Sequence, residues 1–374
     1  MYNEPKAHGK SIPKGETSVT KLELFVPGRV CLFGEHSDWA GGYRRIDSSI
    51  PKGHCLIIGT DQGIRATVTR NPDKLVVNST LPDGQTLGPR SFKMSEDKLL
   101  ECARGGGFYS YSAGVAYQML KRHRVGGVGI ESDRMDLPIR KGLSSSAAIC
   151  VLTVRAFNYL YDLRLTIRGE MELAYFGEIT TPSRCGRMDQ ACAYGKTPVF
   201  LTFDGDEMEA EELHPKGNIY MVIVDLRAGK NTMKILADLN SCYPRGMGKV
   251  GEDVRYYLGP VNAEILAQAK DAVGQGDTQQ VGELMTEAQR LFDKFIAPAS
   301  PSELASPKLH KVLSDPKIQE LIWGGKGVGS QGDGCAQFVA RGTEEREELK
   351  KRLVELDVEC FDLDIKAGGE VAVP

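Results

Sequence analysis

Residues 27–42 carry arginine, glutamate, histidine and aspartate side chains between glycines. Arg29 offers a fixed guanidinium fork, and Glu35, His36 and Asp38 follow it closely. Carboxylates and an imidazole suit hydrogen bonds to the hydroxyls of a polyol, and a guanidinium suits an anion. A polar surface loop with turn glycines has the same composition, so this segment alone leaves both interpretations open.

A second segment, residues 142–148, places a glycine before three serines and two alanines, at the start of a long apolar stretch that predicts a helix. The first N–H groups of a helix lack intrahelical partners, and the helix dipole adds positive potential there. Such a loop can cradle phosphate oxygens, while a serine hydroxyl supplies a ligand to Mg²⁺. A well-capped structural helix is the simpler interpretation, although one cap needs only one serine.

A third segment, residues 185–190, contains Gly186 and Asp189, and Asp189 follows Glu178 by eleven residues. With two carboxylates, one can hold a metal while the other meets a substrate hydroxyl. Alone, this spacing is not specific.

Two nucleotide-binding motifs are disfavoured. Residues 327–332 match G-x-G-x-x-G, but a dinucleotide site needs a helix to open after the motif, and residues 335–340 predict a strand instead. The Walker pattern is absent, because position 190, where its first glycine would stand before Gly195-Lys196-Thr197, is Gln190. The glycines near 330 fit a hinge where strands approach closely.

Composition excludes several broad classes. The 374 residues carry a net charge of −3, which argues against nucleic-acid binding through phosphate neutralisation. No stretch reaches the roughly 18 apolar residues of a membrane span, and residues 1–20 are polar without the apolar core of a signal peptide. The nine cysteines form no C-x-x-C pair, which indicates reduced thiols. We therefore expect a cytoplasmic protein with no nucleic-acid or membrane partner.

The expected elements favour an α+β fold with two lobes. Strands are predicted at 22–26 (ending at Pro27-Gly28), 55–59, 64–68, 128–131, 198–202 and 220–226, with helices at 108–122, 144–161 and 171–178. Later helices are predicted at 262–272, 278–295 and 344–353, and short strands at 336–340 and 360–365. This order predicts an N-terminal domain at 1–205 and a C-terminal domain at 206–374.

Taken together and in this order, the three segments resemble the GHMP small-molecule kinases, most closely the galactokinase type. Residues 27–42 match P-G-R-V-x-L-x-G-E-H-x-D-[aromatic]-x-G-G, with Trp39 at the aromatic position. Residues 142–148 match the phosphate loop G-L-S-S-S-A-A, and residues 185–190 match C-G-x-M-D-Q. The third family motif, T-G-A-G-G-G-G-C, is matched loosely at 328–335. The resemblance covers residues 22–365.

This resemblance implies a two-lobed GHMP fold with the active site between the lobes, and an enzyme that uses ATP and Mg²⁺ to phosphorylate a hydroxyl of a monosaccharide, most often the anomeric one. Asp189 then corresponds to the catalytic base or to a substrate-orienting carboxylate, with Arg29 as its cationic neighbour. The further implied positions are Glu35, His36, Asp38 and Gly186 for the sugar, Gly142, Leu143, Ser144, Ser145, Ser146 and Ala147 for the ATP phosphates, and Ser146 and Glu178 for Mg²⁺.

Departures from the family pattern keep alternatives open. An extra segment at 44–49 adds Arg44 and Arg45, and Arg187 stands beside Asp189 where the family has an apolar residue. Arg140 and Lys141 replace the small pair before Gly142. Arg44, Arg45 or Arg187 could bind a carboxylate or phosphate, which suggests a uronic-acid or phosphorylated-sugar substrate, although Glu35 would repel a carboxylate. Two further hypotheses are a galactokinase-like sugar sensor without catalysis and a kinase of a non-sugar alcohol such as mevalonate.

Overall fold

The structure is a computed structural model that describes residues 21–81, 83–137, 143–183 and 185–369. Within these ranges, strands and helices alternate up to β8, and helices dominate afterwards. The strands are β1 (Lys21–Phe33), β2 (Gly53–Asn71), β3 (Lys74–Thr80), β4 (Thr86–Lys93), β5 (Gly127–Met135), β6 (Val199–Asp204), β7 (Glu207–Glu212), β8 (Ile219–Asp225), β9 (Ile322–Gly327), β10 (Cys335–Ala340) and β11 (Glu359–Ile365). The helices are α1 (Ser37–Gly42), α2 (Glu96–Gly105), α3 (Ser110–Arg122), α4 (Ser145–Tyr161), α5 (Ile167–Ile179), α6 (Thr232–Cys242), α7 (Gly248–Tyr256), α8 (Asn262–Gln275), α9 (Thr278–Phe295), α10 (Pro301–Leu304), α11 (Pro307–Leu313), α12 (Pro316–Leu321) and α13 (Thr343–Glu355).

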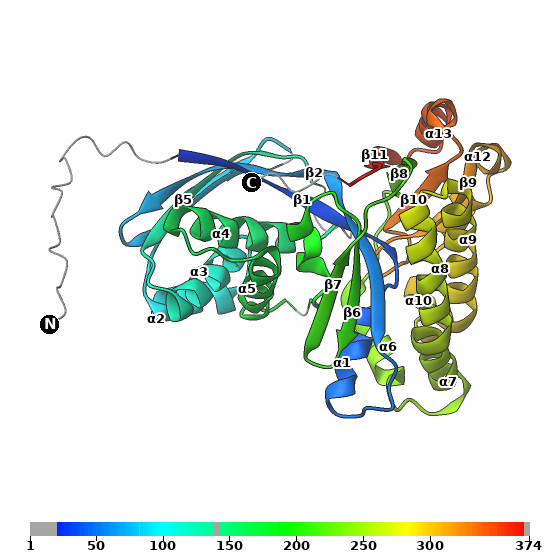
Figure 1. The fold of residues 1–374 in the computed structure, drawn as a ribbon, viewed down its shortest axis with the longest axis horizontal. Coiled ribbons are helices and arrows are strands. Elements are labelled where there is room, and N and C mark those ends of the chain that lie inside the picture. The colour runs from blue at the N-terminus through cyan, green and yellow to red at the C-terminus, as the bar shows by residue number, and fades with distance from the viewer. Residues whose placement is uncertain (1–20, 82, 138–142, 184, 370–374) are drawn as a thin grey trace, which may run out of the picture.

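The larger sheet is organised around the long strand β2. The strand order is β4-β3-β5-β2-β6-β7, and β1 pairs with β2. β1 runs antiparallel along β2, which also pairs with β5 through its second half and with β6 through its first half. Helices α2 to α5 lie together on one side of this sheet (Figure 1). β1 and β2 therefore reach from the helical layer on one side of the molecule to the second sheet on the other.

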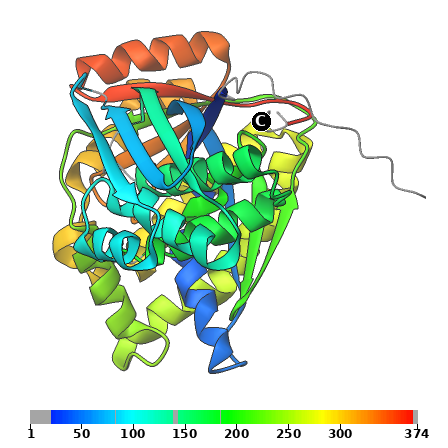
Figure 2. The same ribbon diagram turned by 90° about the vertical axis from the view of Figure 1, so that its left-hand side faces the viewer.

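The smaller sheet has four antiparallel strands in the order β11-β8-β10-β9. Figure 2 shows α13 lying across β11, and α8 and α9 stand beside β9 and β10 in Figure 1. α9 is amphipathic and is capped by Asp277, whose side chain accepts a hydrogen bond from the Gln280 N–H at 3.0 Å. A structural cap of this kind makes a helix start locally predictable, and this helix was predicted at its observed bounds.

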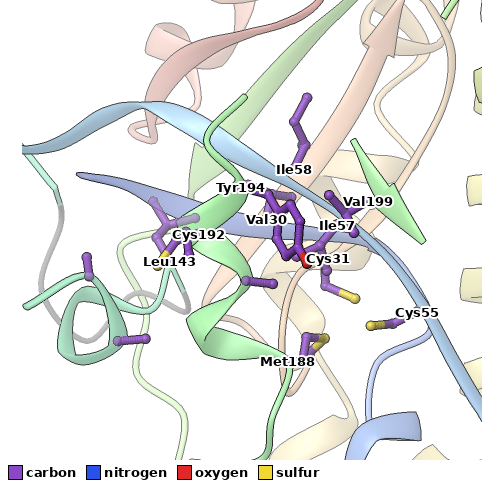
Figure 3. Packing of buried hydrophobic residues seen from close by; sticks show 14 of the residues in the cluster. Val30, Cys31, Cys55, Ile57, Ile58, Leu143, Met188, Cys192, Tyr194 and Val199 are labelled. Atoms are coloured by element: carbon purple, nitrogen blue, oxygen red, sulfur yellow. The ribbon is translucent and has the colours of Figure 1, made fainter. Parts of the chain in front are cut away.

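The buried core continues beneath the segment that follows residue 185. Figure 3 shows Val30, Cys31 and Ile57 of the central strands packed near Met188, Cys192 and Tyr194. The last two lie in η2 (Asp189–Tyr194), a short 3-10 helix. Asp189 is therefore the first residue of a short helix that is anchored in the apolar core by Cys192 and Tyr194.

The predicted α+β class is confirmed, and one predicted strand end is wrong. β1 does not stop at Pro27-Gly28 but continues to Phe33, with a shift in its pairing register between Pro27 and Arg29. A β-bulge accommodates the proline without ending the strand. Likewise the strands predicted at 55–59 and 64–68 are two parts of β2.

The glycine-rich residues 327–332 join β9 to β10, so a strand follows them as predicted. The turn at Gly205 lies between β6 and β7, inside the larger sheet, and the domain boundary placed there stays a prediction. In the described ranges, no helix is both long and apolar enough to cross a membrane.

Candidate active site

The bulge in β1 brings Arg29 against the end of the serine-rich loop. The backbone N–H of Arg29 donates to the Leu143 carbonyl at 3.1 Å. A Cβ atom at Gly28 would lie 2.8 Å from that same carbonyl oxygen, so only glycine allows this close approach. The first and second sequence segments therefore meet at a backbone contact.

Arg29 and Asp189 form an ion pair between the guanidinium Nη2 and the carboxylate Oδ1. The Arg29 side chain is 6% exposed, whereas that of Asp189 is 22% exposed. A buried guanidinium thus holds a carboxylate that still reaches solvent. This arrangement leaves the carboxylate accessible to a ligand.

The carboxylate of Asp38, in the first turn of α1, lies next to this pair. It packs directly on Gly186, where any Cβ atom would collide with the Asp38 Oδ2 atom. Burial and the neighbouring charge of Asp189 raise the pKa of Asp38 to about 6, and hydrogen bonds from the backbone of Trp39 and Met188 oppose that rise. Asp38, Gly186 and Asp189, predicted from separate motifs, therefore share one site.

Glu35 pairs with Lys326 of β9, so this contact joins the larger sheet to the smaller one. Both side chains are almost fully buried, at 3% and 1% exposed. Burial raises the pKa of Glu35, and the Lys326 ammonium opposes this shift. The sequence did not predict Lys326, because nothing in residues 322–327 indicates which carboxylate that lysine meets.

His36 is buried and lies in the left-handed region, with φ 69°. This backbone conformation is uncommon outside glycine and typically marks a tight turn or a functional constraint. Burial, then the positive charge of Lys230, lower the pKa of His36 to about 4, and the Ser330 backbone acts in the opposite sense. The imidazole is therefore neutral at physiological pH.

The serine-rich segment starts α4 as predicted, and Ser144 precedes the helix in the left-handed region with φ 57°. The Ser144 side chain makes no capping hydrogen bond to the helix, so it does not occupy the first-turn N–H groups. Leu143 and Ala147 are buried, which leaves only their backbone atoms for a ligand. The predicted position Gly142 lies outside the described residues, as do Arg140 and Lys141.

Glu178 of α5 is fully buried beside this helix start. Its carboxylate accepts hydrogen bonds from Gln190 Nε2 at 2.7 Å, from Ser183 Oγ at 3.3 Å and from Ser146. Burial and the charge of Asp189 raise the pKa of Glu178. Within the described ranges, no basic side chain pairs with Glu178, and no three His, Cys, Asp or Glu side chains gather as a metal cluster.

Arg44, Arg45 and Arg187, which depart from the family pattern, bind partners within the chain. Arg44 donates to Asp204 at 2.5 Å, and Arg45 lies 3.4 Å from an Asp206 carboxylate oxygen. Arg187 stacks on the Tyr175 ring at 5.1 Å and donates to the Asp206 carbonyl at 2.5 Å. An acidic substrate would have to displace these contacts in order to use them.

The loosely matched residues 328–335 are held by Lys230, whose ammonium donates to the carbonyls of Val328 at 3.3 Å and Gln331 at 2.7 Å. Asp333 accepts hydrogen bonds from the N–H groups of Lys308 and Leu309, at the start of α11. Gln331 and Asp333, which stand where the family motif has glycines, therefore both have partners within the chain.

Comparisons with known proteins agree with this arrangement. Residues 110–196, which include the serine-rich helix start and Asp189, match the family described as GHMP kinases N terminal domain. The galactokinase of Thermococcus kodakarensis is 28% identical over 298 residues, which cover 72% of this chain and 77% of that protein.

Two solved structures share the fold. The Lactococcus lactis galactokinase complexed with galactose matches with a TM-score of 0.69 at 15% identity, covering 94% of this chain and 95% of that chain. The Methanococcus jannaschii mevalonate kinase matches with a TM-score of 0.67 at 19% identity, covering 94% and 98%. The chain thus contains a GHMP kinases N terminal domain at residues 110–196, has the fold of GHMP kinases, and is a phosphotransferase. Its sequence is similar to galactokinases, and the same fold also serves mevalonate kinases.

Proposed function

We propose that this chain transfers the terminal phosphoryl group of ATP to a hydroxyl of a neutral monosaccharide, the anomeric one as in the galactokinase type. The observation that carries the proposal is the carboxylate of Asp189, partly exposed and paired with the buried Arg29 beside Asp38. In this grouping Asp189 is the base, Arg29 is the cation, and Asp38 accepts a hydrogen bond from a substrate hydroxyl.

In this proposal Asp189 accepts the proton of the attacking sugar hydroxyl. Arg29 stabilises the negative charge that develops on the attacking oxygen, and its burial strengthens that interaction. Phosphoryl transfer depends mainly on positioning and on charge stabilisation, so a small set of residues is sufficient.

The start of α4 fits the phosphates of ATP. Its first-turn N–H groups are not capped by Ser144, and Ser144 and Ser145 are partly exposed. Backbone N–H groups and the helix dipole together favour a bound anion. The backbone of Leu143 and Ala147 and the hydroxyls of Ser144 and Ser145 would hold the phosphate oxygens, and Gly142 completes the proposed loop.

The surroundings of Glu178 fit Mg²⁺. A fully buried carboxylate without a basic partner among the described residues is stabilised when a cation binds, and Mg²⁺ commonly takes one or two carboxylates together with substrate phosphates. Ser146 and Glu178 would hold the ion, and Gln190 and Ser183 orient the carboxylate. When bound, the ion neutralises charge on the phosphates.

Asp38 supports a hydroxyl-rich substrate, because its carboxylate lies beside Asp189 and packs on Gly186 without a side chain between them. Glu35 is neutralised by Lys326, so its charge no longer argues against an acidic sugar. The arginines that suggested an acidic sugar are engaged elsewhere, and this favours the neutral one. The Asp189, Glu178 and serine set likewise favours catalysis over a sugar sensor.

The test is ADP release from Mg²⁺-ATP with galactose, arabinose, fucose, glucose, mannose, glucuronate, galacturonate and mevalonate. We expect turnover of a neutral sugar, with loss of its reducing end if the anomeric hydroxyl is phosphorylated. Asp189→Asn should abolish that turnover, whereas Asp206→Asn, an exposed carboxylate, should not. Turnover of uronates alone or of mevalonate alone would overturn the proposed substrate, and sugar binding without turnover would support the sensor.

A further inference from the structure

The environment of His36 determines which of its ring nitrogens carries a proton. The indole Nε1 of Trp39 lies 3.2 Å from Nδ1 of His36. An indole N–H is only ever a donor, so the nitrogen that it meets must be an acceptor. A neutral imidazole that accepts at Nδ1 carries its single proton on Nε2.

Aromatic packing fixes both rings. The Trp39 ring meets Tyr243 edge-on at 5.7 Å, and Tyr243 in turn contacts Tyr43 at 5.8 Å. The His36 ring stacks against Phe292 of α9 at 6.3 Å with an interplanar angle of 23°. These contacts come from α1 and its continuation, from the segment after α6, and from α9, so neither ring turns freely about its Cβ.

The other nitrogen of His36 is buried and has no hydrogen-bond partner among the residues that the structure describes. The Ser330 backbone interacts with the ring but does not reach hydrogen-bond geometry with Nε2. Buried polar atoms are normally paired, so an unpaired donor in a fixed ring points to a ligand that supplies an acceptor.

We propose that Trp39 is a positioning residue that holds His36 in its Nε2–H tautomer, so that His36 donates a hydrogen bond to an oxygen of the substrate. This rests on the proposed function for the identity of the substrate but not for the tautomer. His36 stays neutral because burial and the charges of Lys230 and Lys326 disfavour a third positive charge. A neutral ring has one N–H, so the tautomer decides whether His36 donates to the substrate or accepts from it.

The tautomer is tested without substrate by NMR of protein labelled with ¹⁵N-histidine. The chain has six histidines, and His36→Gln assigns the signal of His36. In the wild type at pH 7 we expect an unprotonated Nδ1 and a protonated Nε2. Trp39→Phe keeps an aromatic ring but removes the donor, and we expect a mixture of tautomers. A wild-type signal with the proton on Nδ1, or an unchanged single tautomer in Trp39→Phe, would overturn the proposal.

The consequence for the reaction is tested with Mg²⁺-ATP and the sugar of the panel that is phosphorylated best. Trp39→Phe should raise the KM for that sugar by about 5–30-fold, which corresponds to the free energy of one hydrogen bond, with a smaller change in kcat. In a His36→Gln background the amide N–H donates whatever its neighbour, so adding Trp39→Phe should change KM less than about twofold. The matched control is Trp323→Phe, since Trp323 is the other tryptophan and stacks on Arg341.

The outcomes separate the two proposals. An equal effect of Trp39→Phe in both backgrounds means that Trp39 acts through packing, and overturns its role as a tautomer-fixing residue. A wild type that phosphorylates no neutral sugar of the panel overturns the proposed function, while the NMR result still decides the tautomer.

Discussion

Two buried arginines in this kinase pair with carboxylates, and they differ in how completely the pair is enclosed. Arg155 donates to Glu170 at 2.9 Å and to the Ala193 carbonyl at 2.9 Å, and Asn158 donates to the other Glu170 oxygen at 2.8 Å. The side chains of Arg155 and Glu170 are 5% and 3% exposed. In the Arg29–Asp189 pair, by contrast, the carboxylate is 22% exposed.

The enclosed Arg155–Glu170 pair stabilises the fold, whereas the Arg29–Asp189 pair is open to a substrate. The Glu170 carboxylate is enclosed and out of reach of a substrate, whereas the Asp189 carboxylate faces solvent and can accept a substrate proton. The two pairs are also connected, because Ala193 belongs to η2, the element that begins at Asp189. The enclosed pair thus anchors the element that carries the open one.

The largest expected effect is on turnover, from Asp189→Ala. Positioned acid–base help contributes about 10²–10⁴-fold, so kcat should fall by at least that factor. The measurement is steady-state ADP release with the best sugar of the panel, together with a urea unfolding curve. Near-wild-type turnover would remove Asp189 from the mechanism and with it the contrast between the two pairs.

Arg155→Met should act mainly on stability. It leaves Glu170 buried without its cation, and loss of one partner of a buried pair costs about 3–5 kcal/mol. Urea denaturation followed by circular dichroism should show this loss, with kcat per folded molecule reduced far less than by Asp189→Ala. A variant that unfolds normally but is inactive would mean that Arg155 also serves the chemistry.

Asp38→Asn should raise stability while lowering activity. The pKa of Asp38 is raised from 3.8 to about 6 in the folded protein. Between these two pH values Asp38 is therefore protonated in the folded state and ionised in the unfolded state. Wild-type stability therefore falls as pH rises from about 4 to 6, and the carboxylate disfavours folding above pH 6. At pH 8 the asparagine variant should be more stable by on the order of 1–3 kcal/mol.

This gain should vanish near pH 4, where Asp38 is protonated in the folded protein. Thermal unfolding of both proteins at pH 4, 6 and 8 measures it. A gain of the same size at every pH would show that the substitution acts through packing and not through the charge.

The smallest expected effect comes from Arg187→Met. The stacking of Arg187 on Tyr175 contributes about 0.5–1 kcal/mol, and that is the expected loss of stability. The ratio of kcat/KM for galactose to that for galacturonate should stay unchanged. A selective loss of galacturonate turnover would instead make Arg187 a ligand of an acidic substrate.

Local sequence patterns predicted where helices begin and end. Ser144 and the alanines after it predicted the start of α4, and apolar spacing predicted α9 at its observed bounds. The motifs predicted that Arg29, Asp38 and Asp189 share one site; in the structure Arg29 pairs with Asp189, and Asp38 packs on Gly186.

The features that depend on contacts between residues far apart in the chain were not predicted. Pro27-Gly28 predicts a strand end, but pairing with β2 carries β1 through it as a bulge. Strands β3 and β4 were not predicted; β4 is mostly exposed and contains Pro89, and it pairs with β3. Lys326 lies 291 positions from Glu35, and no local signal assigns one charge to the other over that separation.

The pair of Glu35 and Lys326 also limits how this sequence can diverge. Replacing either residue alone leaves the other as an unpaired charge in a site that is almost fully closed to water. An exchange of both together, for a reversed pair or for two apolar side chains, avoids that intermediate. The two positions should therefore vary jointly among functional relatives, and a collection of such sequences in which they vary independently would show that the ion pair is dispensable.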